Sequence, residues 1–248
     1  MAEDFTDRST YRRRVAPAGL RSFTVTIAES DLHISVGGGE KDGPLGTARR
    51  ALAAARADLE AYIAAHPEFK TALEPWPEEE RAPGIVREMI AAGRAAGVGP
   101  MAAVAGAVAQ AVGRALFPES PEVIVENGGD IFMAGREERV AAVFAGDSPL
   151  SMKLGLKLPA APAGCGLATS SGTVGPSLSF GKADAAVAFA ADPALADACA
   201  TAIGNRVKSA ADLAAAMEFA EGIEGLSGAL AIIGENLAAW GEMELVEL

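Results

Sequence analysis

The chain has 248 residues, half of them hydrophobic and only 5% aromatic, and its formal net charge is −12. This length allows one large domain or two small ones, and the shortage of aromatic side chains predicts a core of closely packed, alanine-rich helices. The negative charge argues against general nucleic-acid binding, because that activity needs a basic surface.

The basic residues, the cysteines, the N-terminal sequence and the apolar runs indicate the compartment and the partners to expect. The one basic cluster, Arg12–Arg14, indicates a solvated terminal arm or an anion or subunit contact. Two cysteines are too few for a disulfide framework, and the N-terminus lacks the pattern of a signal peptide. Residues 97–113 are the least polar run but are too short and weakly apolar for a membrane span. We therefore expect a cytoplasmic protein without membrane association.

The first half of the chain predicts two strands and three helices. Apolar and polar residues alternate between Phe23 and Val36, which indicates two strands or one bent strand. A helical pattern follows from Thr47 to about Ala65, where His66-Pro67 ends it. Further helices are predicted over residues 85–96 and 100–116, with Pro100 in the first turn of the second.

The second half predicts seven strands and two helices. Strands are predicted over residues 122–126, 131–133, 139–144, 153–158, 183–190, 228–233 and 243–248, and helices over residues 193–207 and 211–221. Because strands come mostly as hairpins and helices in blocks, the fold class predicted is α+β, with a mixed or antiparallel sheet. No composition shift demands a boundary, so residues 1–248 are predicted to form one domain, with residues 1–20 as an extended arm.

The segment Asn127-Gly128-Gly129-Asp130 has two interpretations. An Asn-Gly pair between apolar runs is a hairpin turn signal by itself. Two glycines beside two polar side chains also suit close approach by a ligand.

The run Thr169-Ser170-Ser171-Gly172 lies in a stretch that concentrates glycines and hydroxyls, predicted to be a loop. A flexible linker has a similar composition, but this run is flanked by apolar segments, which favours a ligand-binding loop. It lacks the lysine-serine ending of a P-loop and the pattern of a nucleophile elbow. Its hydroxyls suit phosphate or carboxylate oxygens.

Asp197 and Thr201 are spaced one helical turn apart. On one helix face, their carboxylate and hydroxyl suit a hard cation such as Mg²⁺. They are otherwise ordinary helix-surface residues. Asp192 precedes Pro193 and is better explained as an N-cap.

Other reactive residue types give weaker signals. His33 is predicted to share a strand face near Glu29 and Asp31, where it is a weak acid–base candidate, whereas His66 marks a helix end. Cys165 is either a reactive thiol or a small buried side chain, and Cys199 is expected to pack within its helix. No catalytic residue is identified.

Together, residues 125–131, 168–172 and 196–202 resemble the ordered motifs of ApbE-like proteins, which include the FAD:protein FMN transferases. The closer resemblance is to an uncharacterised branch of that superfamily, carried by residues 97–106, 169–175 and 177–184, and it extends from about Tyr11 to the C-terminus. The resemblance departs at Pro176, where related sequences of the branch often have histidine, and the transferases' His-Ile-x-Asp-Pro segment is replaced by residues 177–184.

The resemblance implies an ApbE-like fold related to the T-fold. It further implies that Asp197 and Thr201 bind Mg²⁺ beside the pyrophosphate of FAD, that residues 127–130 and 169–172 line the flavin site, and that a hydroxyl on a partner protein accepts the transferred group. Some members of the branch in methane-producing archaea are associated with sulfur assimilation. Three hypotheses therefore stand: a Mg²⁺-dependent protein binding flavin or another phosphorylated small molecule, a sulfur-handling accessory protein using Cys165, and a structural homo-oligomer.

Overall fold

An eight-stranded sheet forms the centre of the computed structural model, which describes residues 19–38, 43–173 and 180–248. All its neighbouring strands are antiparallel. In spatial order the strands are β1 (Arg21–Ile27), β2 (Ser30–Gly37), β3 (Glu122–Asn127), β4 (Asp130–Gly135), β7 (Ala161–Ser170), β8 (Ala185–Ala190), β9 (Leu226–Ile233) and β10 (Asn236–Gly241).

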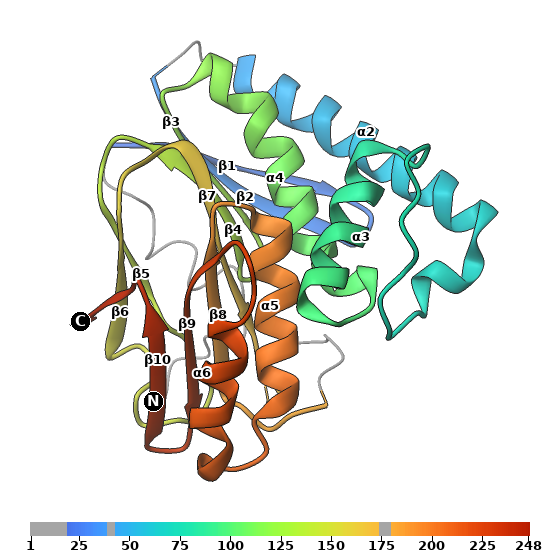
Figure 1. Cartoon of the computed structure of the whole chain (residues 1–248). Coiled ribbons are helices and arrows are strands. Elements are labelled where there is room, and N and C mark those ends of the chain that lie inside the picture. Colours follow the sequence, from blue (N-terminus) through green and yellow to red (C-terminus); the bar gives the residue numbers. More distant parts are fainter. Residues whose placement is uncertain (1–18, 39–42, 174–179) are drawn as a thin grey trace.

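Helices cover one face of this sheet and a smaller sheet covers part of the other, so the molecule is layered (Figure 1). The helices are α2 (Gly43–Ala65), α3 (Gly84–Ala96), α4 (Val104–Leu116), α5 (Pro193–Arg206) and α6 (Leu213–Glu221). The small antiparallel sheet has the order β11 (Glu244–Glu247), β6 (Leu154–Leu158), β5 (Arg139–Ala142). Short 3₁₀ helices occupy Pro67–Lys70, Pro100–Ala103, Phe117–Glu119 and Ala210–Asp212.

The two faces of the central strands carry side chains of different size. Because side chains alternate along a strand, Ala186, Ala188 and Ala190 of β8 face the helices, whereas Val187 and Phe189 face the small sheet. The alanine face lets α5 lie very close to the sheet. At Gly166 of β7, a Cβ atom would stand only 2.3 Å from the Cα of Pro193.

The predicted α+β class and the layered, antiparallel architecture with alanine-rich helices are confirmed. Two strands differ from the prediction. The expected loop around residues 164–175 is strand as far as Ser170, and β10 was not predicted. Both segments are rich in alanine and glycine, which are weak strand formers, so pairing with neighbouring strands decides their conformation.

Two predictions about the chain as a whole remain predictions. Residues 1–18 lie outside the described residues, so the extended arm and Arg12–Arg14 are not placed, and the one-domain organisation stays an expectation. Among the described residues, Pro100–Glu119 is long and apolar enough to cross a membrane, but 56% of its most apolar stretch is buried inside the protein. The core helix of a folded domain has the same character.

Candidate functional site

The carboxylate of Asp197 lies at the N-terminus of α4. Its Oδ2 atom accepts a hydrogen bond of 2.8 Å from the backbone N–H of Gly106, in the first turn of that helix. A Cβ atom on Gly106 would lie 2.2 Å from the carbonyl oxygen of Pro193 and 2.9 Å from the Cβ of Asp197. Glycine at position 106 therefore permits the contact, and the positive end of α4 faces the carboxylate.

The tip of the β3–β4 hairpin meets the same helix end. Asn127 and Asp130 pair across a two-residue turn, Gly128–Gly129, in which both φ angles are positive, at 69° and 117°. The predicted turn is thus confirmed, since left-handed conformations favour glycine. The side-chain amide of Asn127 donates to the carbonyl of Ala105 at 3.1 Å. This bond ties the hairpin to the start of α4.

Asp130 joins the hydroxyl segment to this point. Its carboxylate is buried and accepts a hydrogen bond from the backbone N–H of Thr169, near the end of β7. A Cβ atom on Gly129 would be 3.7 Å from the carbonyl oxygen of Thr169. The hairpin tip, the end of β7 and α5 therefore converge, so three of the predicted segments meet in space.

The two carboxylates affect each other's ionisation. Burial raises the pKa of Asp130 well above its usual value, and the neighbouring Asp197 charge raises it further. Burial also raises the pKa of Asp197, to about 7, although the N–H groups of Gly106 and Ala105 favour its charged form. In the described part of the chain, no lysine or arginine pairs with either aspartate. Both carboxyl groups can be ionised at a low cost in free energy only if a cation binds between them.

The oxygen groups here fit Mg²⁺. Thr201 lies one turn beyond Asp197 on α5 and is half-buried. Mg²⁺ prefers oxygen ligands and is commonly held by one or two carboxylates together with substrate phosphates. No three histidine, cysteine, aspartate or glutamate side chains among the described residues are arranged to hold a metal by themselves. A cation at this point would therefore need oxygens from a ligand or from water.

The hydroxyl segment continues from strand into loop. Thr169 and Ser170 end β7, and Ser171 and Gly172 follow it. The Gly172 N–H donates to the carbonyl of Ala183 at 2.9 Å, and the Thr173 N–H donates to Ser171 Oγ at 3.1 Å. These bonds fix the backbone beyond β7, unlike that of a free linker.

His33 and Glu29 are not brought together. The Glu29 carboxylate accepts from the guanidinium of Arg56 on α2 at 2.8 Å, and Asp31 accepts from the hydroxyl of Thr26 at 3.1 Å. His33 instead lies opposite Glu126 in the β2–β3 pairing. The structure therefore gives no support to an acid–base group formed with Glu29.

Neither cysteine lies exposed in the structure. Cys165 is buried between the two sheets, on the face of β7 directed away from α5, and burial raises its pKa to about 11. Cys199 packs within the helical core as predicted, and burial raises its pKa to about 12. A thiol at such pKa values is almost wholly protonated at neutral pH and a poor nucleophile.

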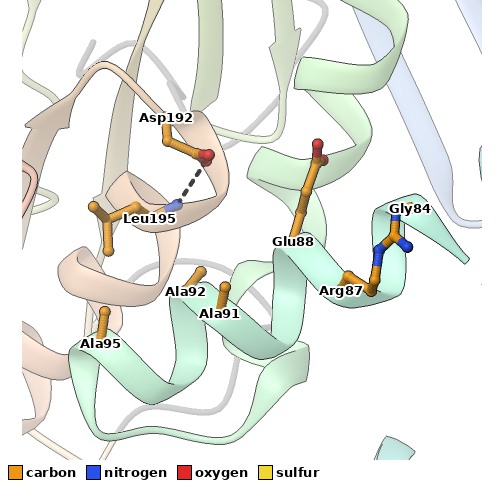
Figure 2. Close-up of a pocket in the computed structure, with 8 residues that line it drawn as sticks. All are labelled: Gly84, Arg87, Glu88, Ala91, Ala92, Ala95, Asp192 and Leu195. Carbon is orange, nitrogen blue, oxygen red and sulfur yellow. Dashed lines mark hydrogen bonds between the residues drawn. The ribbon is translucent and has the colours of Figure 1, made fainter. Parts of the chain in front are cut away.

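A cavity of about 420 Å³ lies elsewhere, between α3 and the start of α5 (Figure 2). Its lining holds none of the predicted site residues. The Asp192 carboxylate in its wall accepts from the N–H groups of Ala194 at 2.9 Å and Leu195 at 3.2 Å, which confirms the predicted N-cap. The lining consists of Gly84, Arg87, Glu88, Ala91, Ala92, Ala95, Asp192 and Leu195.

The family model described as AbpE bacteria matches residues 12–233. The chain belongs to this family. It is 46% identical over 189 residues to a UPF0280 protein of Methanocella arvoryzae, an alignment that covers 76% of this chain and 77% of the relative. It is 42% identical over 229 residues to a UPF0280 protein of Methanosarcina acetivorans, covering 90% of this chain and 85% of the relative.

Solved structures confirm the ApbE-like fold. The flavin transferase ApbE from Vibrio cholerae superposes with a TM-score of 0.58 at 10% identity, covering 90% of this chain and 97% of that one. The apo flavinyl transferase ApbE from Pseudomonas stutzeri superposes with a TM-score of 0.51 at 15% identity, covering 89% and 94%. At such identities the likeness shows the fold of this family member, and function has to be argued from its own residues.

Sequence reasoning overlooked two features of the site. The role of Gly106 was missed, although a glycine within an alanine- and valine-rich helix is a signal of close packing. The electrostatic interaction between Asp130 and Asp197 joins positions 67 residues apart, and spacing along the chain gives no signal for it.

Proposed function

We propose that this protein binds a flavin nucleotide or a similar phosphorylated ligand together with Mg²⁺. The observation that carries the proposal is the pair of carboxylates, Asp130 and Asp197, which interact electrostatically near the hydroxyl segment and form no ion pair with a lysine or arginine of the described residues. A divalent cation would supply the missing positive charge, and a ligand phosphate would complete its coordination.

Each predicted segment has a task in this proposal. Asp197 and Thr201 would hold the cation, while Asn127 keeps the hairpin tip against α4 through its bond to Ala105. Ser170 and Ser171 would offer hydroxyls to ligand oxygens. Bound Mg²⁺ would neutralise a pyrophosphate and improve the nucleotide as a leaving group. FMN transfer to a hydroxyl of an acceptor protein is the finer form of the proposal.

The sulfur-handling alternative gains no support from the position of Cys165. Its thiol lies on the far side of β7 from α5 and is buried among large side chains. A ligand held by Asp197 would therefore be separated from this thiol by the sheet itself.

Calorimetric titration with FAD tests the proposal, with and without Mg²⁺. We expect saturable binding that depends on Mg²⁺ and is lost in Asp197→Ala. Asp58→Ala, which changes an exposed carboxylate on α2, is the matched control and should bind as the unmodified protein does. Absence of binding by the unmodified protein, or equal binding by Asp197→Ala, would refute the proposal.

A further inference from the structure

Phe180 is an exposed aromatic residue whose backbone is hydrogen-bonded to α5. Its residue surface is 56% exposed, the highest value for any aromatic residue in the described ranges. Its backbone N–H donates to Oδ1 of Asn205, near the end of α5, at 2.8 Å. A single exposed apolar side chain needs no explanation by itself, but its attachment to α5 relates it to the candidate site.

The attachment point continues the polar stripe of α5. Asp197, Thr201 and Asn205 follow one another at intervals of four residues, so they lie along one side of the helix. At 1.5 Å per residue, Asn205 stands about 6 Å along the axis from Thr201 and about 12 Å from Asp197. Phe180 is thus fixed at one end of a stripe whose other end carries the candidate cation site.

Three glycines allow the backbone segments of this region to pack closely. A Cβ atom on Gly181 would lie 1.8 Å from the carbonyl oxygen of Gly204 on α5, and one on Gly172 would lie 2.5 Å from the carbonyl oxygen of Gly181. The Lys182 N–H also donates to the carbonyl of Val207 at 2.7 Å. The segment bearing Phe180 is therefore packed between the hydroxyl segment and the end of α5.

We propose that Phe180 is the stacking surface for the planar ring of the ligand, an inference that rests on the proposed function. The ligand class is a nucleotide or flavin whose ring is joined by a sugar or sugar-alcohol linker to a phosphate at Asp197 and Thr201. An aromatic face binds any planar π-system without reading its edge.

The test uses the full chain and two probes, FAD and inorganic pyrophosphate, each with Mg²⁺. Only FAD carries a ring, so Phe180→Ala should weaken FAD binding about tenfold or more, in line with measured stacking contributions, and leave pyrophosphate binding unchanged. Phe180→Trp should keep FAD affinity and quench flavin fluorescence by contact with the indole. Phe117→Ala, which removes an aromatic ring that is 38% exposed just beyond α4, is the matched control and should change neither affinity.

The possible outcomes distinguish the stacking inference from the proposed function. If Phe180→Ala binds FAD as the unmodified protein does while Asp197→Asn does not bind it, the stacking inference is wrong and the proposed function stands. If Phe180→Ala loses FAD and pyrophosphate equally, the residue supports the site's structure and the inference is again wrong. If the unmodified protein binds neither probe, both the stacking inference and the proposed function are wrong.

Discussion

The Asp197 carboxylate on α5 accepts the backbone N–H of Gly106 at 2.8 Å, so one helix supplies the N-terminal cap of another. Ala103, at the N-cap position of α4, offers no side-chain acceptor of its own. The observed capping role and the proposed cation-binding role therefore fall on one side chain. Variants that separate the charge of Asp197 from its hydrogen bond can distinguish the two roles.

Asp197→Asn makes this separation. The amide oxygen can still accept the Gly106 N–H, whereas the negative charge beside Asp130 is removed. We expect the metal-free variant to unfold at the same or a higher temperature than the unmodified protein near pH 8, because repulsion between buried carboxylates is relieved. Mg²⁺-dependent FAD binding should fall at least about tenfold, corresponding to about 1.4 kcal/mol.

Asp197→Ala is the companion variant, since it removes both the charge and the cap, whose loss typically costs about 1 kcal/mol. Thermal melts followed by circular dichroism and FAD titrations measure both properties. A strongly destabilised Asp197→Asn with normal FAD affinity would indicate a purely structural carboxylate.

The stability of the metal-free protein should decrease as pH rises. Burial raises the pKa of Asp197 from 3.8 to about 7 in the folded chain, so between these values the native state binds more protons than the unfolded state. Titration of Asp197 therefore lowers the free energy of unfolding between about pH 4 and pH 7. Asp130, whose pKa is also raised, acts in the same direction. Urea unfolding in chelator at several pH values measures this slope, which should be smaller in Asp197→Asn.

Substitution of Gly106 tests the packing of α4 against α5, which positions Asp197. A methyl group at this position would meet the Pro193 carbonyl at 2.2 Å, so Gly106→Ala should push α4 away from α5 and cost about 1–3 kcal/mol or more. Gly84→Ala is the matched control, because its added methyl meets nothing within 4 Å and helix propensity favours alanine by up to about 1 kcal/mol. Denaturant titrations should therefore give free-energy changes of opposite sign. Equal changes would contradict the close contact.

Much of the fold can be predicted from local patterns. The hairpin turn at Gly128–Gly129 and the N-cap at Asp192 depend on residues adjacent in sequence, and both predictions are confirmed. Strand β7 could not be predicted in this way, because its Gly164, Cys165 and Gly166 have little intrinsic strand preference. Its conformation comes from pairing with β4 and β8 on either side.

The candidate site, like the fold, can be predicted only in part from the sequence. The motif residues Asp130, Thr169 and Asp197 were identified as candidates, but their meeting depends on glycine contacts between distant segments. The sequence also does not show which face of β7 carries Cys165, because a shift of one residue in strand register exchanges the two faces. The stacking role that we propose for Phe180 depends on its bond to Asn205, 25 residues further along the chain.

Cys165 should be protected in the folded protein. Its pKa of about 11 and its burial between the sheets leave almost no accessible thiolate at pH 7.5. We expect iodoacetamide to label neither cysteine in native protein and both in urea, and exposure of native protein to polysulfide to add no sulfur detectable by mass spectrometry. Cys165→Ala should bind FAD with unchanged affinity while losing about 1–2 kcal/mol of stability from the emptied core position. Rapid native labelling of Cys165, or persulfide formation there without unfolding, would instead revive the sulfur-handling hypothesis and require the small sheet to move aside.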